Sequence, residues 1–257
     1  MTDQTTAGAL SADDQSAIEQ AHAIRDGSEW FFEKIIQPFA GGLESTAPQL
    51  EPSSTPISDK AFNMIVMFEV SSQAAYQAKY QHPIWPGGAS GVTIGIGYDV
   101  GYVSQQLLGQ DWQGAIPDAV IQALRPAIGV RGASAQGLAQ SLQATVTVPW
   151  TPAITVHRTK VIPKWIALVQ KYLSNTDKLD GDCLGALVSL TYNRGASFDQ
   201  DGDRFTEMRN IRADMESQNF ADIPGQIRSM KRLWPTVRGL QIRRDSEAAL
   251  FEAGLAA

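Results

Sequence analysis

The segment GVTIGIGYD, residues 91–99, is the stretch that decides how this chain is expected to fold. Its β-branched residues and its glycines predict an extended segment near a tight turn, ending at Asp99. Upstream, the apolar run FNMIVMF, residues 62–68, has helical spacing and leads directly into Glu69. A carboxyl group among apolar neighbours is poorly solvated, so we expect the pKa of Glu69 to be raised.

The carboxyl groups of Glu69 and Asp99 are expected in different surroundings, which suits acid–base catalysis. Glycoside hydrolysis uses one protonated carboxyl and one ionised carboxylate. We expect Glu69 to act as the general acid, and Asp99 to activate water or to stabilise the charge of the transition state. Plainer interpretations stay open, because a helix Glu can lie on an exposed face and a turn Asp can cap the following segment, residues 100–102.

Three segments of the chain resemble the phage-type lysozymes, glycoside hydrolase family 24 in the broad sense. TIGIG, residues 93–97, fits the family's hairpin pattern Thr-Ile-Gly-x-Gly, which follows a helix-ending Glu. ALVSLTYNRG, residues 186–195, resembles the family's core helix ending in Asn-x-Gly. GLQIRRDSEAALF, residues 239–251, is similar to the closing helix Gly-Leu-x-x-Arg-Arg-x-x-Glu-x-x-Leu-Phe. The three matches stand in the family's order.

One departure from the usual phage pattern decides which residues of this chain match the family's catalytic positions. The second carboxylate usually stands nine residues after the Glu, where this chain has Ala78, and Gly87 stands six residues before Thr93. The longer spacing, with Asp99 six residues after Thr93, resembles the pesticin-like muramidase subgroup instead. The resemblance therefore implies Glu69, Asp99 and Thr93 as catalytic residues, although Thr93 also suits simple strand packing.

Further residues are expected to contact the glycan. They are Trp85, Tyr98, Asn193, Gly95 and Gly97. The aromatic rings could stack on sugars, the glycines allow close backbone approach, and the Asn ends a helix that faces the cleft in the lysozyme fold. Core packing for the aromatics and helix capping for the Asn remain as alternatives.

The family pattern also implies that Arg243 or Arg244 pairs with Glu69, and the sequence does not say which. The alternative is a surface salt bridge with Glu247 at helical spacing.

The expected fold is α+β and mostly helical: a lysozyme-like fold with a small β-hairpin lobe and a helical lobe. Residues 1–57 are predicted to form an N-terminal helical extension and linker, and residues 58–257 the catalytic domain. Predicted helices cover residues 11–25, 29–39, 58–79, 103–108, 117–128, 133–144, 152–172, 181–194, 204–215, 223–234 and 240–253.

Composition limits the partners and cofactors that we expect for this chain. The 257-residue chain carries a net charge of −6, which gives no electrostatic help toward nucleic acid or anionic membranes. A single cysteine, Cys183, excludes an intrachain disulfide. We find no secretory signal and no apolar run long enough to insert in a membrane. The histidines lack zinc-ligand spacing, and acids alternating over residues 199–203 form only half of a calcium-loop motif, so no metal is expected.

Taken together, these features predict a peptidoglycan muramidase that needs no cofactor. It would be made in the cytoplasm and act in the periplasm or cell wall after delivery, as a type VI effector, a bacteriocin or a phage endolysin. A glycan strand would be its substrate, and an immunity protein or a secretion-machine component would be its partner. Two alternatives remain: a lytic transglycosylase using Glu69 alone, and a catalytically silent peptidoglycan-binding module.

Overall fold

The computed structural model describes residues 11–21 and 50–257, which are mostly helical with one small antiparallel sheet. The expectation of a mostly helical α+β fold is confirmed. The predicted helix 29–39, residues 40–49 of the predicted linker and residues 22–25 of the first predicted helix lie outside the described residues. No helix in the described ranges has both the length and the apolar character needed to cross a membrane.

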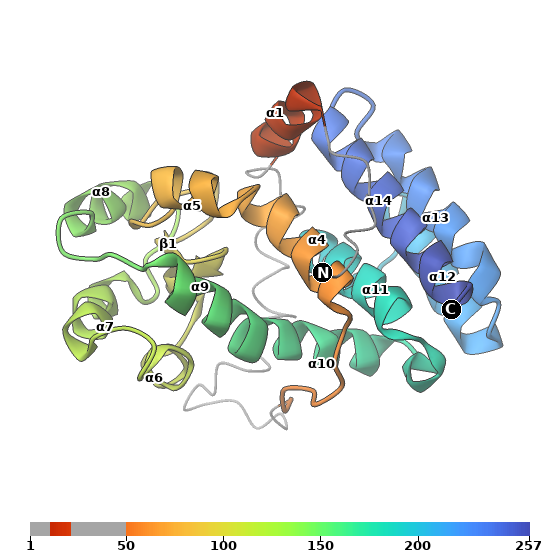
Figure 1. Ribbon diagram of the computed structural model, residues 1–257, viewed down its shortest axis with the longest axis horizontal. Coiled ribbons are helices and arrows are strands. Elements are labelled where there is room, and N and C mark those ends of the chain that lie inside the picture. Colours follow the sequence, from red (N-terminus) through yellow and green to blue (C-terminus); the bar gives the residue numbers. More distant parts are fainter. Residues whose placement is uncertain (1–10, 22–49) are drawn as a thin grey trace, which may run out of the picture.

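Figure 1 shows two groups of elements near the two ends of a long helical rod. The hairpin lies near one end with short helices: α5 (Gln73–Lys79), α6 (Gln105–Trp112), α7 (Asp118–Leu124) and α8 (Ala133–Leu142). The C-terminal helices lie toward the other end: α11 (Gly181–Arg194), α12 (Thr206–Ser217), α13 (Ile223–Ser229) and α14 (Arg238–Leu255). Short 3-10 segments occur at Val100–Tyr102, Arg125–Ala127, Thr176–Lys178, Asp203–Phe205, Phe220–Asp222 and Met230–Leu233.

The rod consists of α9 (Trp150–Val156), a π-helical turn at His157–Val161, and α10 (Ile162–Tyr172). The sequence predicts a helix over 152–172 with a break near Pro163. The structure keeps the helix continuous, and Pro163 stands in the first turn of α10, directly after the wider π turn.

The predicted helix 58–79 is divided in two. Helix α4 (Asp59–Val70) starts at Ser58, whose side chain accepts from the N–H of Ala61, and ends at Ser71, which has a positive φ of 62°. Ser72 then caps α5 by accepting from the N–H of Ala75. Glu69 therefore stands in the last turn of α4 and not in mid-helix.

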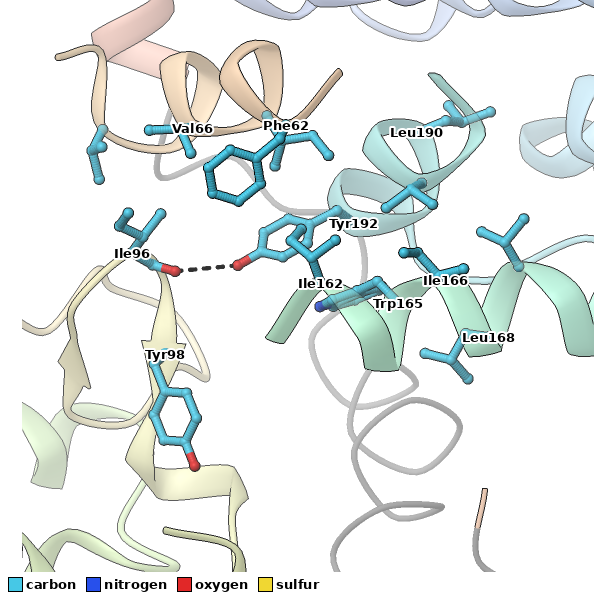
Figure 2. Packing of buried hydrophobic residues seen from close by; sticks show 14 of the residues in the cluster. Phe62, Val66, Ile96, Tyr98, Ile162, Trp165, Ile166, Leu168, Leu190 and Tyr192 are labelled. Carbon is cyan, nitrogen blue, oxygen red and sulfur yellow. Dashed lines mark hydrogen bonds between the residues drawn. The ribbon is translucent and has the colours of Figure 1, made fainter. Parts of the chain in front are cut away.

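The hairpin consists of strands β1 (Thr93–Ile94) and β2 (Tyr98–Asp99), with Thr93 opposite Asp99. The turn between them places Gly95 and Gly97 at φ values of 57° and 70°, which glycine adopts without steric cost. The hydroxyl of Tyr192 on α11 donates to the Ile96 carbonyl at the tip of this turn, 3.3 Å away (Figure 2). Figure 2 also shows Phe62 and Val66 of α4 in the same core, so the hairpin tip is packed against the helices.

Helix α1 (Ala12–Ala21) packs mainly on α14 and also contacts α4 (Figure 1). Ile18 and Ala21 are its buried side chains. This short helix is thus part of the folded unit, ahead of the predicted domain start at residue 58.

Candidate active site

Glu69 is not a surface residue. Its side chain is only 7% exposed, and its Oε1 accepts a hydrogen bond from Nη1 of Arg243 at 2.9 Å. Because α4 ends one residue later, the carbonyl dipoles of the last turn oppose negative charge at this position, and the guanidinium of Arg243 compensates for them. The interpretation of Glu69 as an exposed helix residue therefore does not hold.

Arg243 holds Glu69 through contacts with several helices. Its Nε donates to Glu247 at 3.1 Å on its own helix, and its Nη2 donates to the backbone carbonyl of Ser189 on α11 at 3.1 Å. Its guanidinium also lies 5.3 Å from the ring of Phe68. These contacts make Arg243 the partner of Glu69, a choice that the sequence leaves open.

Glu247 connects the two arginines of α14. It is fully buried, and it accepts hydrogen bonds from the Ser189 hydroxyl at 2.6 Å and from Arg244 at 2.8 Å. Arg244 is also fully buried, and desolvation lowers its pKa to about 10. The predicted pairing with Glu247 is present, but it is buried and not a surface salt bridge.

Asn193 lies beside this network. It follows Ser189 by one helical turn on α11, and it lines a small pocket together with Phe68, Glu69 and Arg243. The other residues lining the pocket are Gly239, Leu240, Ile18 and Ala21. The structure thus brings together Glu69 and Asn193, two of the residues that the sequence analysis selects. The space between them is about 10 Å³, room for one water molecule.

Asp99 and Thr93 lie together in the hairpin, and neither lines the Glu69 pocket. The Asp99 carboxylate accepts from the backbone N–H of Gly91 at 2.8 Å and from that of Gly101 at 2.9 Å. Its side chain thereby caps the 3-10 segment Val100–Tyr102, as the plainer interpretation expects. Thr93 is buried, and its hydroxyl lies 3.4 Å from the Gly91 carbonyl.

Tyr98 is buried and does not line the Glu69 pocket. Its hydroxyl donates to the buried carboxylate of Asp111 at 2.9 Å, and Lys164 pairs with that same carboxylate. Burial raises the pKa of Tyr98 well above its ordinary value of 10.0. Figure 2 shows the ring pointing away from α4 and from Tyr192. The expectation that Tyr98 stacks on a sugar is replaced by core packing, because its polar end already has a buried partner.

The remaining predicted glycan contacts lie around the hairpin. Trp85 is half-buried, and its indole N–H donates to the Ser90 carbonyl at 3.0 Å. A Cβ added at Gly95 would lie 2.9 Å from the ring of Trp112, so this glycine lets the turn pack on the core. Gly97 supplies the second positive φ of the turn. None of the three lines the Glu69 pocket.

Sequence reasoning missed the supporting residues of the Glu69 site. Ser189 was not assigned a role, Glu247 was expected only as a surface partner of Arg243 or Arg244, and Ile18 and Ala21 of α1 were not expected near Glu69. The helical spacings from Ser189 to Asn193 and from Arg243 to Glu247 are visible in the sequence and could have indicated two shared faces. The docking of α1 has no comparable signal, since it joins segments far apart in the chain.

Among residues 11–21 and 50–257, no group of three or more His, Cys, Asp or Glu side chains is placed to hold a metal ion. Asp203, in the acidic segment 199–203, pairs with Arg232 at 2.7 Å. The Glu69 site is therefore built from a carboxyl, guanidinium groups and an amide. No protein-family model matches the chain, and no curated protein matches it either.

Proposed function

We propose that this chain has a lysozyme-like fold and acts as a peptidoglycan muramidase, cleaving the β-1,4 bond between N-acetylmuramic acid and N-acetylglucosamine. One observation carries the proposal: the helix that ends just after Glu69 meets helices from the second and third of the segments that resemble the phage-type lysozymes. The first segment is preceded by Glu69 itself, the second supplies Ser189 and Asn193, and the third supplies Arg243 and Glu247.

In this proposal Glu69 protonates the glycosidic oxygen of the leaving sugar. A general acid must be held in place and must also be able to carry a proton. Arg243 fixes the position of the carboxyl, and Glu247 shares the guanidinium, so Arg243 does not act on Glu69 alone. Asn193, at the same pocket, would donate or accept a hydrogen bond with the sugar.

The second carboxylate in this proposal is that of Asp99, which lies in the hairpin and not in the Glu69 pocket. Asp99, with Thr93 opposite it in the hairpin, would activate water or stabilise the oxocarbenium-like transition state. Its oxygens already accept backbone hydrogen bonds from Gly91 and Gly101. This observation favours a second candidate, a lytic transglycosylase that uses Glu69 alone and needs no activated water.

The substrate would be met in the periplasm or cell wall. We propose that the chain is a delivered lytic protein, for which a machine component or an immunity protein that plugs the Glu69 site would be the protein partner.

The test compares purified wild type, Glu69→Gln and Asp99→Asn on purified peptidoglycan, with products identified by mass spectrometry. Glu216→Gln serves as the control, because Glu216 is exposed and pairs with its helix neighbour Arg212. New reducing ends from wild type and the control, lost in both site variants, would support a two-carboxylate hydrolase. Loss of a general acid should reduce the rate by about 10²–10⁴.

Anhydro-muramyl products that persist in Asp99→Asn would instead establish the transglycosylase. Glycan binding without any product, with all four proteins folded, would leave a silent binding module.

A further inference from the structure

The surface around Glu69 is covered by a segment from the far N-terminal part of the chain. Ile18 and Ala21 of α1 are 2% and 7% exposed, and both line the pocket that contains Glu69, Asn193 and Arg243. Ligand pockets usually measure hundreds of cubic ångströms, whereas the space left here is about 10 Å³. The pocket between α1 and Glu69 is therefore too small for a sugar ring.

We propose that α1 is an autoinhibitory element that occludes the Glu69 site, and that its displacement uncovers the glycan-binding surface. This inference rests on the proposed function for the identity of the glycan. The surface uncovered would include Phe68, Glu69, Asn193, Leu240 and Arg243, all of which line the pocket under α1.

The body of the protein is shaped to receive α1. A Cβ at Gly239 would lie 2.3 Å from the carbonyl oxygen of Ala17 and 2.7 Å from the Cβ of Ala21, so only glycine lets α14 approach α1 this closely. Charge is matched as well. Asp14 pairs with Arg238 at 2.6 Å, and Glu19 pairs with Lys79 of α5. The docked position is thus specified by shape and by charge.

The same contacts indicate that the docking of α1 contributes little to the stability of the protein. Only two of its ten residues are buried, and in each of the two ion pairs that it forms within residues 11–21 and 50–257 the basic side chain is at least half exposed. Exposed ion pairs contribute little to stability and are screened by salt. The helix can therefore be released without unfolding the core beneath it, which is what an occluding segment requires.

Two sets of variants in the full-length chain test the inference. Ile18→Asp places a charge in the docked face, and Gln20→Asp places the same charge on an exposed position of the same helix as a matched control. Glu19→Lys reverses one ion pair without touching the core, and adding Lys79→Glu restores it. Circular dichroism confirms that each variant folds.

Three readouts are taken for each variant: hydrogen exchange of the peptide ending α4, pelleting with insoluble peptidoglycan in the Glu69→Gln background, and product release. We expect Ile18→Asp to raise exchange, binding and product release about tenfold. Gln20→Asp should match wild type, Glu19→Lys should fall between them, and the double reversal should return to wild type.

The outcomes separate this inference from the proposed function. Equal glycan binding and equal product release by Ile18→Asp and wild type, despite raised exchange at α4, would overturn occlusion and leave the hydrolase intact. Increased glycan binding by Ile18→Asp without any product would support occlusion and overturn the hydrolase. No binding and no product from any variant would overturn both.

Discussion

The carboxylate of Asp99 accepts a hydrogen bond from the backbone N–H of Gly91 at 2.8 Å, tying the end of β2 to the residue that leads into β1. A second bond from the Gly101 N–H, at 2.9 Å, starts the next turn. One side chain thus closes the hairpin and orders the segment that follows it.

Removing that side chain should destabilise the protein. Hydrogen bonds to charged groups contribute about 1.5–3 kcal/mol each, so we expect Asp99→Ala to lower the free energy of unfolding by about 2 kcal/mol or more. Urea denaturation measures this, with the exposed Asp201→Ala as the control. Equal stability of the two variants would show that the backbone bonds to Asp99 contribute little, and a loss of activity alone would then favour a purely catalytic role.

Glu247 should be among the most sensitive positions of the chain. Glu247→Gln removes a buried anion that two arginines share, and leaving a buried charge without its partner costs about 3–5 kcal/mol. The control is Glu252→Gln on the same helix, since Glu252 pairs with Arg228 at the surface and its loss should cost at most about 1 kcal/mol. Thermal unfolding followed by circular dichroism compares them. Similar melting temperatures would mean that the buried network relaxes around a neutral side chain.

Cys183 should resist thiol reagents in the folded protein. It is 1% exposed, its Sγ donates to the Phe251 carbonyl at 3.2 Å, and burial raises its pKa to about 12. Because the thiolate is the reactive form, we expect labelling by a disulfide reagent at pH 8 only as fast as the protein unfolds. The rate should therefore rise with urea along the unfolding transition. Rapid labelling without denaturant would contradict the buried position.

Docking of α1 should depend on pH at both ends of the scale. The side-chain hydrogen bond from Arg238 lowers the pKa of Asp14 below its ordinary 3.8, so this contribution is complete above about 3.8 and disappears as the pH falls through the lowered value. The hydrogen bond to Glu19 raises the pKa of Lys79 above 10.5, so that contribution is complete below about 10.5 and disappears as the pH rises through the raised value.

Hydrogen-exchange protection factors, which correct for intrinsic pH dependence, test this window. Amides of α1 should lose protection at the acid and alkaline ends and at high salt, while amides of α11 keep theirs. Protection of α1 that does not respond to pH or to salt would show that apolar contacts alone hold the helix.

Helices with strong local signals were predicted well. The prediction of 181–194 coincides with α11, where Asp180 caps the N-terminus and Gly195 follows the last helical residue. The closing helix was predicted within two residues of each end of α14. In both cases the apolar pattern and the terminal residues agree, so the local sequence determines the element.

Contacts between distant segments were predicted only in part: the family pattern implied that Arg243 or Arg244 pairs with Glu69, and the structure has this pair with Arg243. The break at Ser71 has a local signal in the Ser72 cap, but the apolar pattern running past it hid that signal. The choice of Arg243 over Arg244 follows from how α14 rotates against α4 and α11, which no single segment encodes. The capping of Gly91 by Asp99 likewise needs the strand register, which the sequence alone does not specify.

Consecutive residues of α11 serve different parts of the molecule. Tyr192 is bonded to the hairpin tip, whereas Asn193 lines the Glu69 pocket. One rigid helix therefore connects the hairpin tip to the Glu69 pocket. The hairpin cannot move relative to Glu69 unless α11 rotates or the Tyr192 hydrogen bond breaks. Helix α11 thus sets the distance between the carboxyl groups of Glu69 and Asp99. Any opening of the molecule between these two groups would first break the hydrogen bond of the Tyr192 hydroxyl.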